Sequence, residues 1–360
     1  LHWSAMASHP AAQAESRTLT WRHGRADLQR LGAMLAPVVF ESPGHPPFAP
    51  LQVAPWCDEP GAAELPGILR RLRGDWPCVP FGRTDRPAGL FDGGPPGWTA
   101  REPHDAWGHG HSSHHDWQWA DAAASDPLSL VLEMTLPAGD PIAHLRRQVT
   151  ARADAPALDL TLTITPRIDC TLPVALHPTL RLDAGRVQLD IAHAGSALSY
   201  PVPPEPSSRL QANARFEALH AAPLAAGGTT DLSRYPQGAD SEELLQLVQV
   251  AGPVHARYLD AGWALTLDWD HAALPDLMLW VSHRGRPQPP WNGRHWALGI
   301  EPVNGVFDLG RVAAPPADHP LAGRAGLSLR AGVPTTLRHS LSAQPLAQPP
   351  VTRSSPPEAP

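Results

Sequence analysis

The sequence predicts an all-β protein, because two observations exclude long helices and favour strands. Its 360 residues include 44 prolines and 29 glycines, spread along the whole chain. Proline breaks helix interiors, so the elements between these breaks are short. Within them apolar and polar residues alternate, and this period of two puts alternate side chains on opposite faces of a sheet. We therefore expect one large antiparallel sandwich or barrel.

The clearest strand is expected at 157–167, ALDLTLTITPR, where leucine or isoleucine alternates with Asp and Thr. Segments 128–136 and 145–153 alternate in the same way on either side of PAGDPIA, which predicts a hairpin. Further strands are expected at 186–194, 245–260 and 263–270.

Helical character is expected at only two places. Segment 64–74, ELPGILRRLRG, is predicted to form one or two turns. Segment 241–250, SEELLQLVQV, fits a short helix on its own, but it continues into the alternating pattern that reaches residue 260. Both alternatives stay open there, because short apolar runs do not distinguish helix from strand.

No internal repeat and no linker divides the middle of the chain, so a single domain is expected over residues 18–342. Residues 1–17 lack a basic region followed by an apolar core, so they do not read as a signal peptide. We expect a disordered leader there. Residues 343–360 are rich in Pro, Ser and Ala, which predicts a disordered tail.

Charge and cysteine content argue against several classes of protein. The formal net charge is -7 at pH 7, and clustered basic residues that would bind nucleic acid are not evident. The sequence contains no run of about 18 apolar residues, so no membrane span is predicted. Cys57, Cys78 and Cys170 are widely spaced without a CxxC pair, so neither a structural zinc site nor a disulfide framework is expected. A reduced, cytoplasmic setting fits best.

Glu301 is the first candidate for acid–base chemistry. It follows an apolar pair in LGIEPVNGVFDLG, residues 298–310, and precedes Pro302. Proline lacks an N–H and tends to end or edge a strand. The carboxylate is therefore expected at a strand end beside a turn, where it can face a cleft. The alternative is a solvent-exposed glutamate at the start of a loop.

His177 is the second candidate. It interrupts the apolar segment LPVALHPTLRL, residues 172–182, and precedes Pro178. A lone histidine in such a strand is more often a core residue than an acid or a base. It becomes a functional candidate only if a carboxylate and a polar cleft lie beside it.

Four histidines gather in AWGHGHSSHHDWQWAD, which suggests either a metal site or a crowded loop. The potential ligands are His109, His111, His114, His115 and Asp116. Residues spaced i, i+3 or i, i+4 share a face only on a helix, and the two glycines argue against a helix. No HExxH motif is present. We therefore interpret the segment as a loop and expect no metal.

Tryptophan supplies most of the aromatic side chains, with 13 Trp against 3 Tyr and 6 Phe. Indole rings pack well on the apolar faces of sugars, and their N–H groups can donate. Several lie in or near the segments above: Trp98, Trp107, Trp117, Trp119, Trp280 and Trp291. Of these, Trp117 and Trp291 are expected to contact a sugar, with core packing as the alternative.

Three motifs together resemble the aldose 1-epimerase (galactose mutarotase-like) superfamily. They are His109–Gly110, His177–Pro178 and Glu301–Pro302, in the order in which that family has its HG, HP and EP motifs. The segment LTWRHGRADLQRLGAMLAPVVFE, residues 19–41, is similar to the family's opening hairpin. The resemblance spans most of residues 18–342.

This resemblance implies a galactose mutarotase-like β-supersandwich and a cofactor-free interconversion of α and β anomers of an aldose. It implies that Glu301 is the base at O1 and His177 the acid at O5, on opposite sides of the hemiacetal. His109 would position the ring, and His111 would line the cleft. An imidazole suits the acid role, because its ordinary pKa lies near neutrality.

The residues that would hold the sugar hydroxyls depart from the family's pattern. Arg83 and Arg86 lie after the early strands, but outside the usual asparagine–arginine context. A hydroxyl-binding aspartate is expected among Asp260, Asp268 and Asp270, with Asp260 taken as the candidate.

Two further functions remain open. Arg284, Arg286 and Arg294 could hold a phosphate, as in a hexose-6-phosphate 1-epimerase-like enzyme, since arginine forks suit phosphate. The alternative is that these arginines pair with nearby carboxylates, although Arg294 is kept as a sugar-binding candidate. The third possibility is a non-catalytic carbohydrate-binding protein on the same fold.

Overall fold

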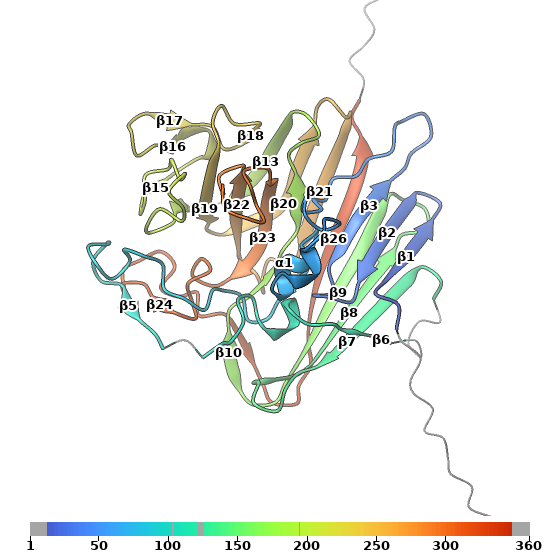
Figure 1. Ribbon diagram of the computed structural model, residues 1–360, viewed down its shortest axis with the longest axis horizontal. Helices are drawn as coiled ribbons and strands as arrows, with labels where there is room; N and C mark the ends of the chain where they lie inside the picture. Colours follow the sequence, from blue (N-terminus) through green and yellow to red (C-terminus); the bar gives the residue numbers. More distant parts are fainter. Residues whose placement is uncertain (1–12, 103, 121–125, 194, 348–360) are drawn as a thin grey trace, which may run out of the picture.

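The computed structural model describes residues 13–102, 104–120, 126–193 and 195–347, and two large antiparallel sheets dominate it (Figure 1). In spatial order the nine-stranded sheet is β18 (Arg234–Tyr235), β13 (Val187–His193), β20 (Val250–Tyr258), β21 (Trp263–Trp269), β26 (Thr335–Pro345), β9 (Ala157–Pro166), β8 (Ile142–Ala151), β7 (Ser129–Thr135) and β6 (Gln118–Trp119). The all-β prediction is confirmed.

The second sheet has eight strands and carries the site described below. In spatial order they are β15 (Arg215–Phe216), β14 (Ala197–Ser199), β19 (Ser241–Leu247), β22 (Asp276–His283), β23 (Trp296–Asn304), β11 (Val174–Leu176) and β4 (Pro77–Cys78), with β12 (Thr179–Arg181) also paired to β23. Segment 241–250 thus begins with a strand, which settles the helix-or-strand alternative in favour of the strand.

The remaining described elements are short. Strands β1 (Ser16–Trp21), β2 (Gly24–Gln29) and β3 (Leu35–Phe40) form a small sheet, and the segment that resembled an opening hairpin lies in it. Three two-stranded pairs are β10 (Cys170–Leu172) with β25 (Leu327–Leu329), β16 (Ala222–Pro223) with β17 (Thr229–Thr230), and β24 (Ala313–Ala314) with β5 (Thr99–Ala100). The helices are α1 (Gly67–Arg70), η1 (Ala62–Glu64), η2 (His111–Ser113) and η4 (Leu219–Ala221).

The predicted alternation is present in the strands. In β9 the side chains of Leu158, Leu160, Leu162 and Ile164 are buried, whereas the residues between them are half-buried. Strand β9 pairs with β8 over nearly its whole length, and β8 pairs with β7 as the predicted hairpin. Segment 64–74 makes a single α-helical turn, α1, in agreement with the expectation of one or two turns.

Apolar packing covers both faces of the eight-stranded sheet. On β23, Leu298 and Ile300 join the main core between the two large sheets. On β22, Met278 and Trp280 point the other way, into a second cluster. Met278 lies directly opposite Glu301 in the β22–β23 register. The period of two therefore places Glu301 on the outer face of the sheet, beside this second cluster.

A buried ionic group holds the chain segment that leads to this outer face. Asp75 is fully buried and accepts hydrogen bonds from Arg147 Nη2 at 2.5 Å and His339 Nε2 at 2.9 Å. Arg147 lies on β8 and His339 on β26, so Asp75 ties its segment to the nine-stranded sheet. The next residue is Trp76, which lies in the candidate site.

Strands extend slightly beyond the expected domain limits of 18–342. Strand β1 begins at Ser16 and β26 ends at Pro345. The rest of the expected leader and tail falls mainly on residues 1–12 and 348–360, outside the described residues. In the part of the chain that the structure describes, no helix has the length and apolar character needed to cross a membrane.

Candidate active site

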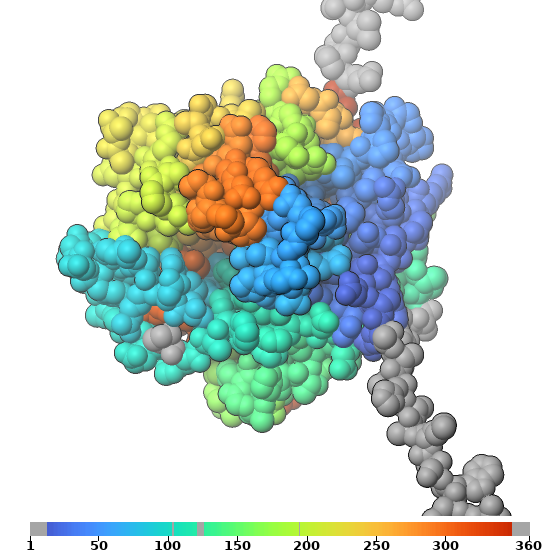
Figure 2. Space-filling view, in the orientation of Figure 1, coloured from blue at the N-terminus to red at the C-terminus, as the bar shows by residue number. Residues whose placement is uncertain are grey.

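A small cavity lies on the outer face of the eight-stranded sheet. Its volume is about 170 Å³, room for on the order of ten waters, which is close to the twelve non-hydrogen atoms of a hexose. Two segments that contribute to its lining, 56–76 in blue and 284–296 in orange, lie side by side on the surface (Figure 2). Trp56 and Trp291 join them by an edge-to-face contact, with ring centroids 4.7 Å apart.

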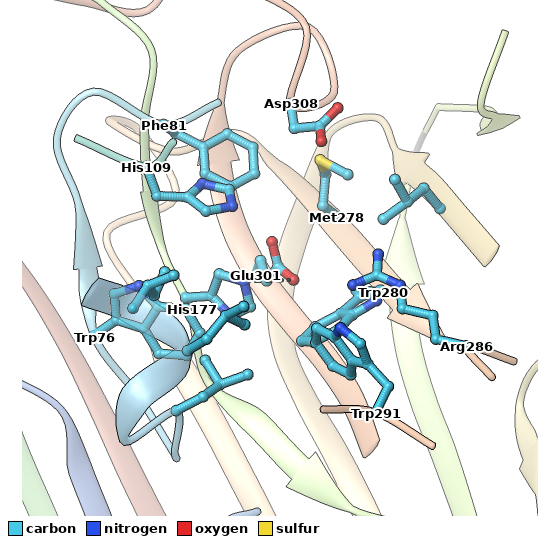
Figure 3. A pocket seen from close by; sticks show the side chains of 14 residues that line it. Trp76, Phe81, His109, His177, Met278, Trp280, Arg286, Trp291, Glu301 and Asp308 are labelled. Atoms are coloured by element: carbon cyan, nitrogen blue, oxygen red, sulfur yellow. Dashed lines mark ion pairs between the residues drawn. The ribbon is translucent and has the colours of Figure 1, made fainter. Parts of the chain in front are cut away.

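Glu301 and His177 lie next to each other in the wall of this cavity (Figure 3). Glu301 Oε1 is 3.3 Å from His177 Nε2, and both side chains are almost fully buried. Gly299, two residues before Glu301, leaves room for the carboxyl group, since a Cβ there would lie 2.3 Å from Glu301 Oε1. Glu301 was expected at a strand end but lies within β23, because the strand continues to Asn304. His177 lies between β11 and β12, and the two side chains meet as a pair.

Neighbouring side chains fix the orientation of His177. Its ring stacks on Trp76, with centroids 3.9 Å apart and planes 14° apart. Its Nδ1 lies 3.1 Å from the hydroxyl of Thr179, and its backbone N–H donates to the Trp76 carbonyl. Because Nδ1 is engaged by Thr179, Nε2 is the nitrogen that faces Glu301 and the cavity.

His109 approaches His177 from a different loop. Its backbone has a φ of 60°, and its N–H donates to the carbonyl of Gly82. Gly110 follows with a φ of 84°, and a Cβ there would lie 2.3 Å from the Val79 carbonyl oxygen, so the HG pair needs its glycine. The His109 ring meets His177 edge to face, with centroids 5.7 Å apart.

Apolar and aromatic side chains form most of the remaining wall. Ile68, Leu69 and Leu72 come from α1 and the residues after it. Trp280 and Trp291 stand on the opposite side from Trp76, as Figure 3 shows. The cavity thus combines extended aromatic surfaces with a few polar groups, which is the usual composition of a small-molecule site.

A second carboxyl group, that of Asp308, faces the cavity near Glu301. The hydroxyl of Tyr200 donates to Asp308 Oδ1 at 2.6 Å. Arg83 lies behind this pair: its backbone N–H donates to the Asp308 carbonyl and its guanidinium binds Asp85 at 2.8 Å. Burial raises the pKa of Asp308, and the nearby Arg83 charge only partly opposes that shift.

Arg286 is the cationic residue among the side chains that line the cavity in the described chain. Its Nε lies 3.1 Å from Glu242 and 3.3 Å from Glu205. Its guanidinium carbon stands 4.5 Å from the centre of the Trp291 ring, within the range of a cation–π contact. Glu242 is fully buried and also accepts a hydrogen bond from the Trp280 indole.

Burial sets the protonation of the central residues. It raises the pKa of Glu301 well above the ordinary 4.5, and the nearby Asp308 adds to this shift. It lowers the pKa of His177 well below 6.5, with a further contribution from His109. It also lowers the pKa of His109 to about 4. Both shifts disfavour the charged forms, so burial favours a protonated Glu301 beside a neutral His177.

Comparison with known proteins identifies the fold. No protein-family model matches the sequence, and no curated protein sequence matches it either. Solved structures do match. A candidate aldose 1-epimerase from Escherichia coli K12 is 17% identical, with a TM-score of 0.60, over 92% of this chain and 99% of that protein. A GalM/aldose epimerase homologue from C. elegans is 15% identical, with a TM-score of 0.59, over 92% of this chain and 100% of the other.

A galactose mutarotase-like protein from Lactobacillus casei matches over 91% of this chain and 100% of its own length, at 13% identity and a TM-score of 0.55. The chain has the galactose mutarotase-like fold. This confirms the fold class that the three motifs implied.

Within this mutarotase-like fold, four of the expected site residues line one cavity. They are Glu301, His177, His109 and Trp291. One detail differs from the expectation: Glu301 and His177 lie side by side, not on opposite sides of a ring. Arg83 is not part of the lining and reaches the site only through Tyr200 and Asp308.

Four other expected residues lie outside the cavity lining. Trp117 is fully buried in the main core, where its indole donates to the Ser112 carbonyl. His111 stacks on His115, with ring centroids 3.7 Å apart. Both residues were expected to contact the ligand. Trp117 does not because it packs in the core, and His111 does not because it stacks on His115.

Asp260 and Arg294 are engaged in ion pairs at the surface. Asp260 binds Arg186 in a bidentate pair, at 2.6 Å for the shortest contact. Arg294 binds Glu59 with both terminal nitrogens. Neither residue lines the cavity. Arg284 likewise pairs with Asp240 at 2.8 Å. Arg284 and Arg294 therefore pair with carboxylates, which was the alternative to binding a phosphate.

The histidine cluster does not converge on a common point. His114 uses Nε2 to contact the Gly108 carbonyl at 2.7 Å, and its Nδ1 accepts from the Ile68 N–H. His115 Nδ1 contacts the His111 carbonyl at 2.8 Å. Across residues 13–102, 104–120, 126–193 and 195–347, no group of three potential ligands is placed to hold a metal ion.

Sequence reasoning missed part of the wall. Sequence reasoning did not single out Trp76, Phe81, Met278 or Asp308. It named Trp280 and Arg286 but did not place them in the same cavity as Glu301. One signal was available: in segment 276–283 the period of two puts Met278 and Trp280 on one face. That face could be recognised as the site side only once β22 was known to pair with β23.

Proposed function

We propose that the protein is an aldose 1-epimerase, an isomerase that interconverts the α and β anomers of an aldose. The observation that carries this proposal is the buried contact of Glu301 Oε1 and His177 Nε2, 3.3 Å apart in the wall of a hexose-sized cavity. Anomer interconversion needs a base and an acid that act on two oxygens bonded to the same carbon, C1. Adjacent groups meet that requirement directly.

The proposed reaction conserves all protons within the sugar and this pair. Glu301, as the carboxylate, takes the proton of the O1 hydroxyl, and the C1–O1 bond becomes a carbonyl. The C1–O5 bond breaks, and His177, as the imidazolium, gives its proton to O5. Rotation about the C1–C2 bond presents the other carbonyl face, and the reverse transfers close the ring.

Burial supports this cycle at its most demanding point. Ring opening leaves Glu301 protonated and His177 neutral, which is the state that burial favours for both groups. This is the same protonation state that burial favours in the unliganded site. Before ring opening, one proton must pass from Glu301 to His177, and their 3.3 Å contact gives it a direct path.

The surrounding side chains suit a sugar. Trp280 and Trp291 offer indole faces for the apolar C–H surface of a pyranose. His109 is held neutral by burial, so its ring can donate or accept one hydrogen bond near O5 without adding charge. These features support sugar binding in this cavity, and the Glu301–His177 pair supports the proposed chemistry.

Polarimetry of freshly dissolved α anomers tests the proposal on a panel of hexoses and pentoses. We expect protein-dependent acceleration for at least one sugar, and Glu301→Gln is expected to lower it about 10²- to 10⁴-fold, the usual contribution of a general base. Glu133→Gln is a matched control, because Glu133 is half-exposed on β7 and pairs with Arg146. Undiminished acceleration by Glu301→Gln would refute the assignment.

The panel also separates catalysis from binding alone. Trp76, Trp280 and Trp291 line the cavity, so a bound sugar should change the tryptophan fluorescence. A sugar that changes the fluorescence without faster anomer exchange would identify a non-catalytic carbohydrate-binding protein on the same fold.

A further inference from the structure

Two polar groups of the cavity have no part in the proton transfers proposed above. Asp308 and Arg286 both line it, on the side away from Trp76 and His109 (Figure 3). The anomeric carbon must lie at Glu301 and His177, so the distal hydroxyls of a bound sugar would extend toward one of the remaining walls. Asp308 is an acceptor and Arg286 a donor on such a wall.

Arg286 is held in place by its Nε side. Glu242 and Glu205 lie 3.1 Å and 3.3 Å from Nε, and the guanidinium stands over the Trp291 ring. None of the described residues accepts a hydrogen bond from its two terminal nitrogens. A guanidinium fixed in this way presents its terminal N–H groups at low entropic cost to oxygens of a ligand.

Asp308 is positioned in a similar manner. The Tyr200 hydroxyl holds Oδ1 at 2.6 Å, and the half-buried residue lines the cavity. A carboxyl group so placed can accept a hydrogen bond from a sugar hydroxyl with its other oxygen.

The charges at this end of the cavity disfavour a phosphate. The Arg286 charge is already balanced by Glu205 and Glu242, and Asp308 stands on the same side. A phosphate dianion buried here would lose its hydration without meeting an unpaired cation, which is costly. Neutral hydroxyls carry no such penalty.

We infer that Asp308 and Arg286 form a clamp for the distal hydroxyls, which makes the enzyme selective for a neutral aldose over its phosphate ester. This inference rests on the proposed function for the orientation of the sugar. It separates two chemistries that the sequence left open, a free aldose and a hexose 6-phosphate.

The first test compares three sugars with their own phosphate esters in the polarimetric assay. The pairs are D-glucose, D-galactose and D-mannose, each with its 6-phosphate. For any hexose that is turned over, we expect kcat/KM at least tenfold higher than for the ester. An ester that is turned over as well as its parent would overturn the inference and leave the epimerase proposal intact.

The second test addresses Arg286. Arg286→Gln is expected to raise KM for the neutral hexose at least tenfold with little change in kcat, because a distal contact is made equally in ground and transition states. Arg284→Gln is the matched control from the same loop, since Arg284 pairs with Asp240 and does not line the cavity. An unchanged KM in Arg286→Gln would contradict the clamp.

The third test uses the sign of the charge. Asp308→Asn removes the carboxylate, so the ratio of kcat/KM for hexose over its 6-phosphate should fall at least fivefold. Asp85→Asn is the control, because Asp85 is exposed, pairs with Arg83 and does not line the cavity. A ratio that is unchanged in Asp308→Asn, or that changes equally in Asp85→Asn, would count against the charge argument.

Fluorescence titration keeps the clamp testable if no sugar is turned over. The neutral hexoses should then still bind to the wild-type chain more tightly than their esters, and Arg286→Gln should weaken that binding. Equal affinity for hexoses and their esters, together with unchanged affinity in Arg286→Gln, would overturn the clamp. A failure of all six sugars to bind would overturn it as well.

Discussion

Glu301 Oε1 lies 3.3 Å from His177 Nε2, yet this buried oxygen has no aligned hydrogen bond within the described structure. Buried polar atoms are nearly always hydrogen-bonded, so an exception needs an explanation. A hydroxyl of a bound ligand would supply the missing partner. Under the proposed function, a sugar hydroxyl would meet the acid–base pair at this oxygen.

The pH dependence of kcat/KM should follow the one-proton state of this pair. Below the lowered pKa of His177 the pair gains a second proton and lacks a base, and above the raised pKa of Glu301 it lacks an acid. The acid limb is thus expected below pH 6.5 and the alkaline limb well above pH 4.5, with a plateau between them. A pH–rate profile on the fastest sugar measures both limbs. An acid limb above pH 6.5, or an alkaline limb at or below pH 4.5, would contradict the directions of these two pKa shifts.

Gly299 should be needed for activity more than for stability. An added Cβ would lie 2.3 Å from Glu301 Oε1, the mobile end of a side chain, so Gly299→Ala should push the carboxyl group aside. A displacement of about 1 Å at a reacting group can cost about 10²-fold in rate. We expect kcat to fall by that order with a small change in Tm.

Gly252→Ala is the matched control, because Gly252 lies on β20 and a Cβ there meets nothing within 4 Å. Parallel measurements of kcat and thermal unfolding on both variants decide the matter. Equal kcat values in the two variants would show that Gly299 does not position Glu301.

Asp75 should contribute mainly to stability. Removing one partner from a buried ionic group typically costs about 3–5 kcal/mol, and Asp75→Asn leaves Arg147 without its carboxylate. Urea unfolding at pH 7 measures the free energy of unfolding. Asp183→Asn, which alters an exposed pair with Arg181, should change it little.

The stabilisation by Asp75 should disappear in acid. Burial alone would raise the pKa of Asp75, but the charges of Arg147 and His339 outweigh it and lower the pKa from 3.8 to about 2. A carboxyl whose pKa is lower in the folded state stabilises the fold above its unfolded pKa and stops doing so as the pH falls through the folded value. The difference in the free energy of unfolding between wild type and Asp75→Asn should therefore become smaller from pH 4 toward pH 2. A difference that stays constant over this range would contradict the assignment.

The sequence singled out three of the cavity-lining candidates because they lie in unusual local contexts. Glu301 and His177 each precede a proline within or at the end of a strand, and His109 precedes a glycine whose conformation the fold requires. Alternation also predicted the strands, since a sheet with buried faces imposes a period of two. These are local properties, and a sequence records them directly.

The rest of the cavity depends on tertiary packing. Phe307 adopts a φ of 47°, in a turn that brings Asp308 back beside Glu301, and no periodicity predicts such a turn. Arg286 and Arg294 lie in one loop, yet the first lines the cavity and the second binds Glu59. The placement of Trp117 in the core was also not predictable from the sequence. An indole suits a core and a sugar face equally well, so the choice depends on tertiary packing.

Magnetisation transfer between the anomeric protons of an equilibrated aldose tests the central claim most directly, because it observes α and β exchange without a change in composition. The exchange rate should rise in proportion to the concentration of wild-type protein and return close to the buffer rate with Glu301→Gln. An exchange rate that does not depend on the protein for any sugar that binds, or one that Glu301→Gln leaves intact, would contradict the account.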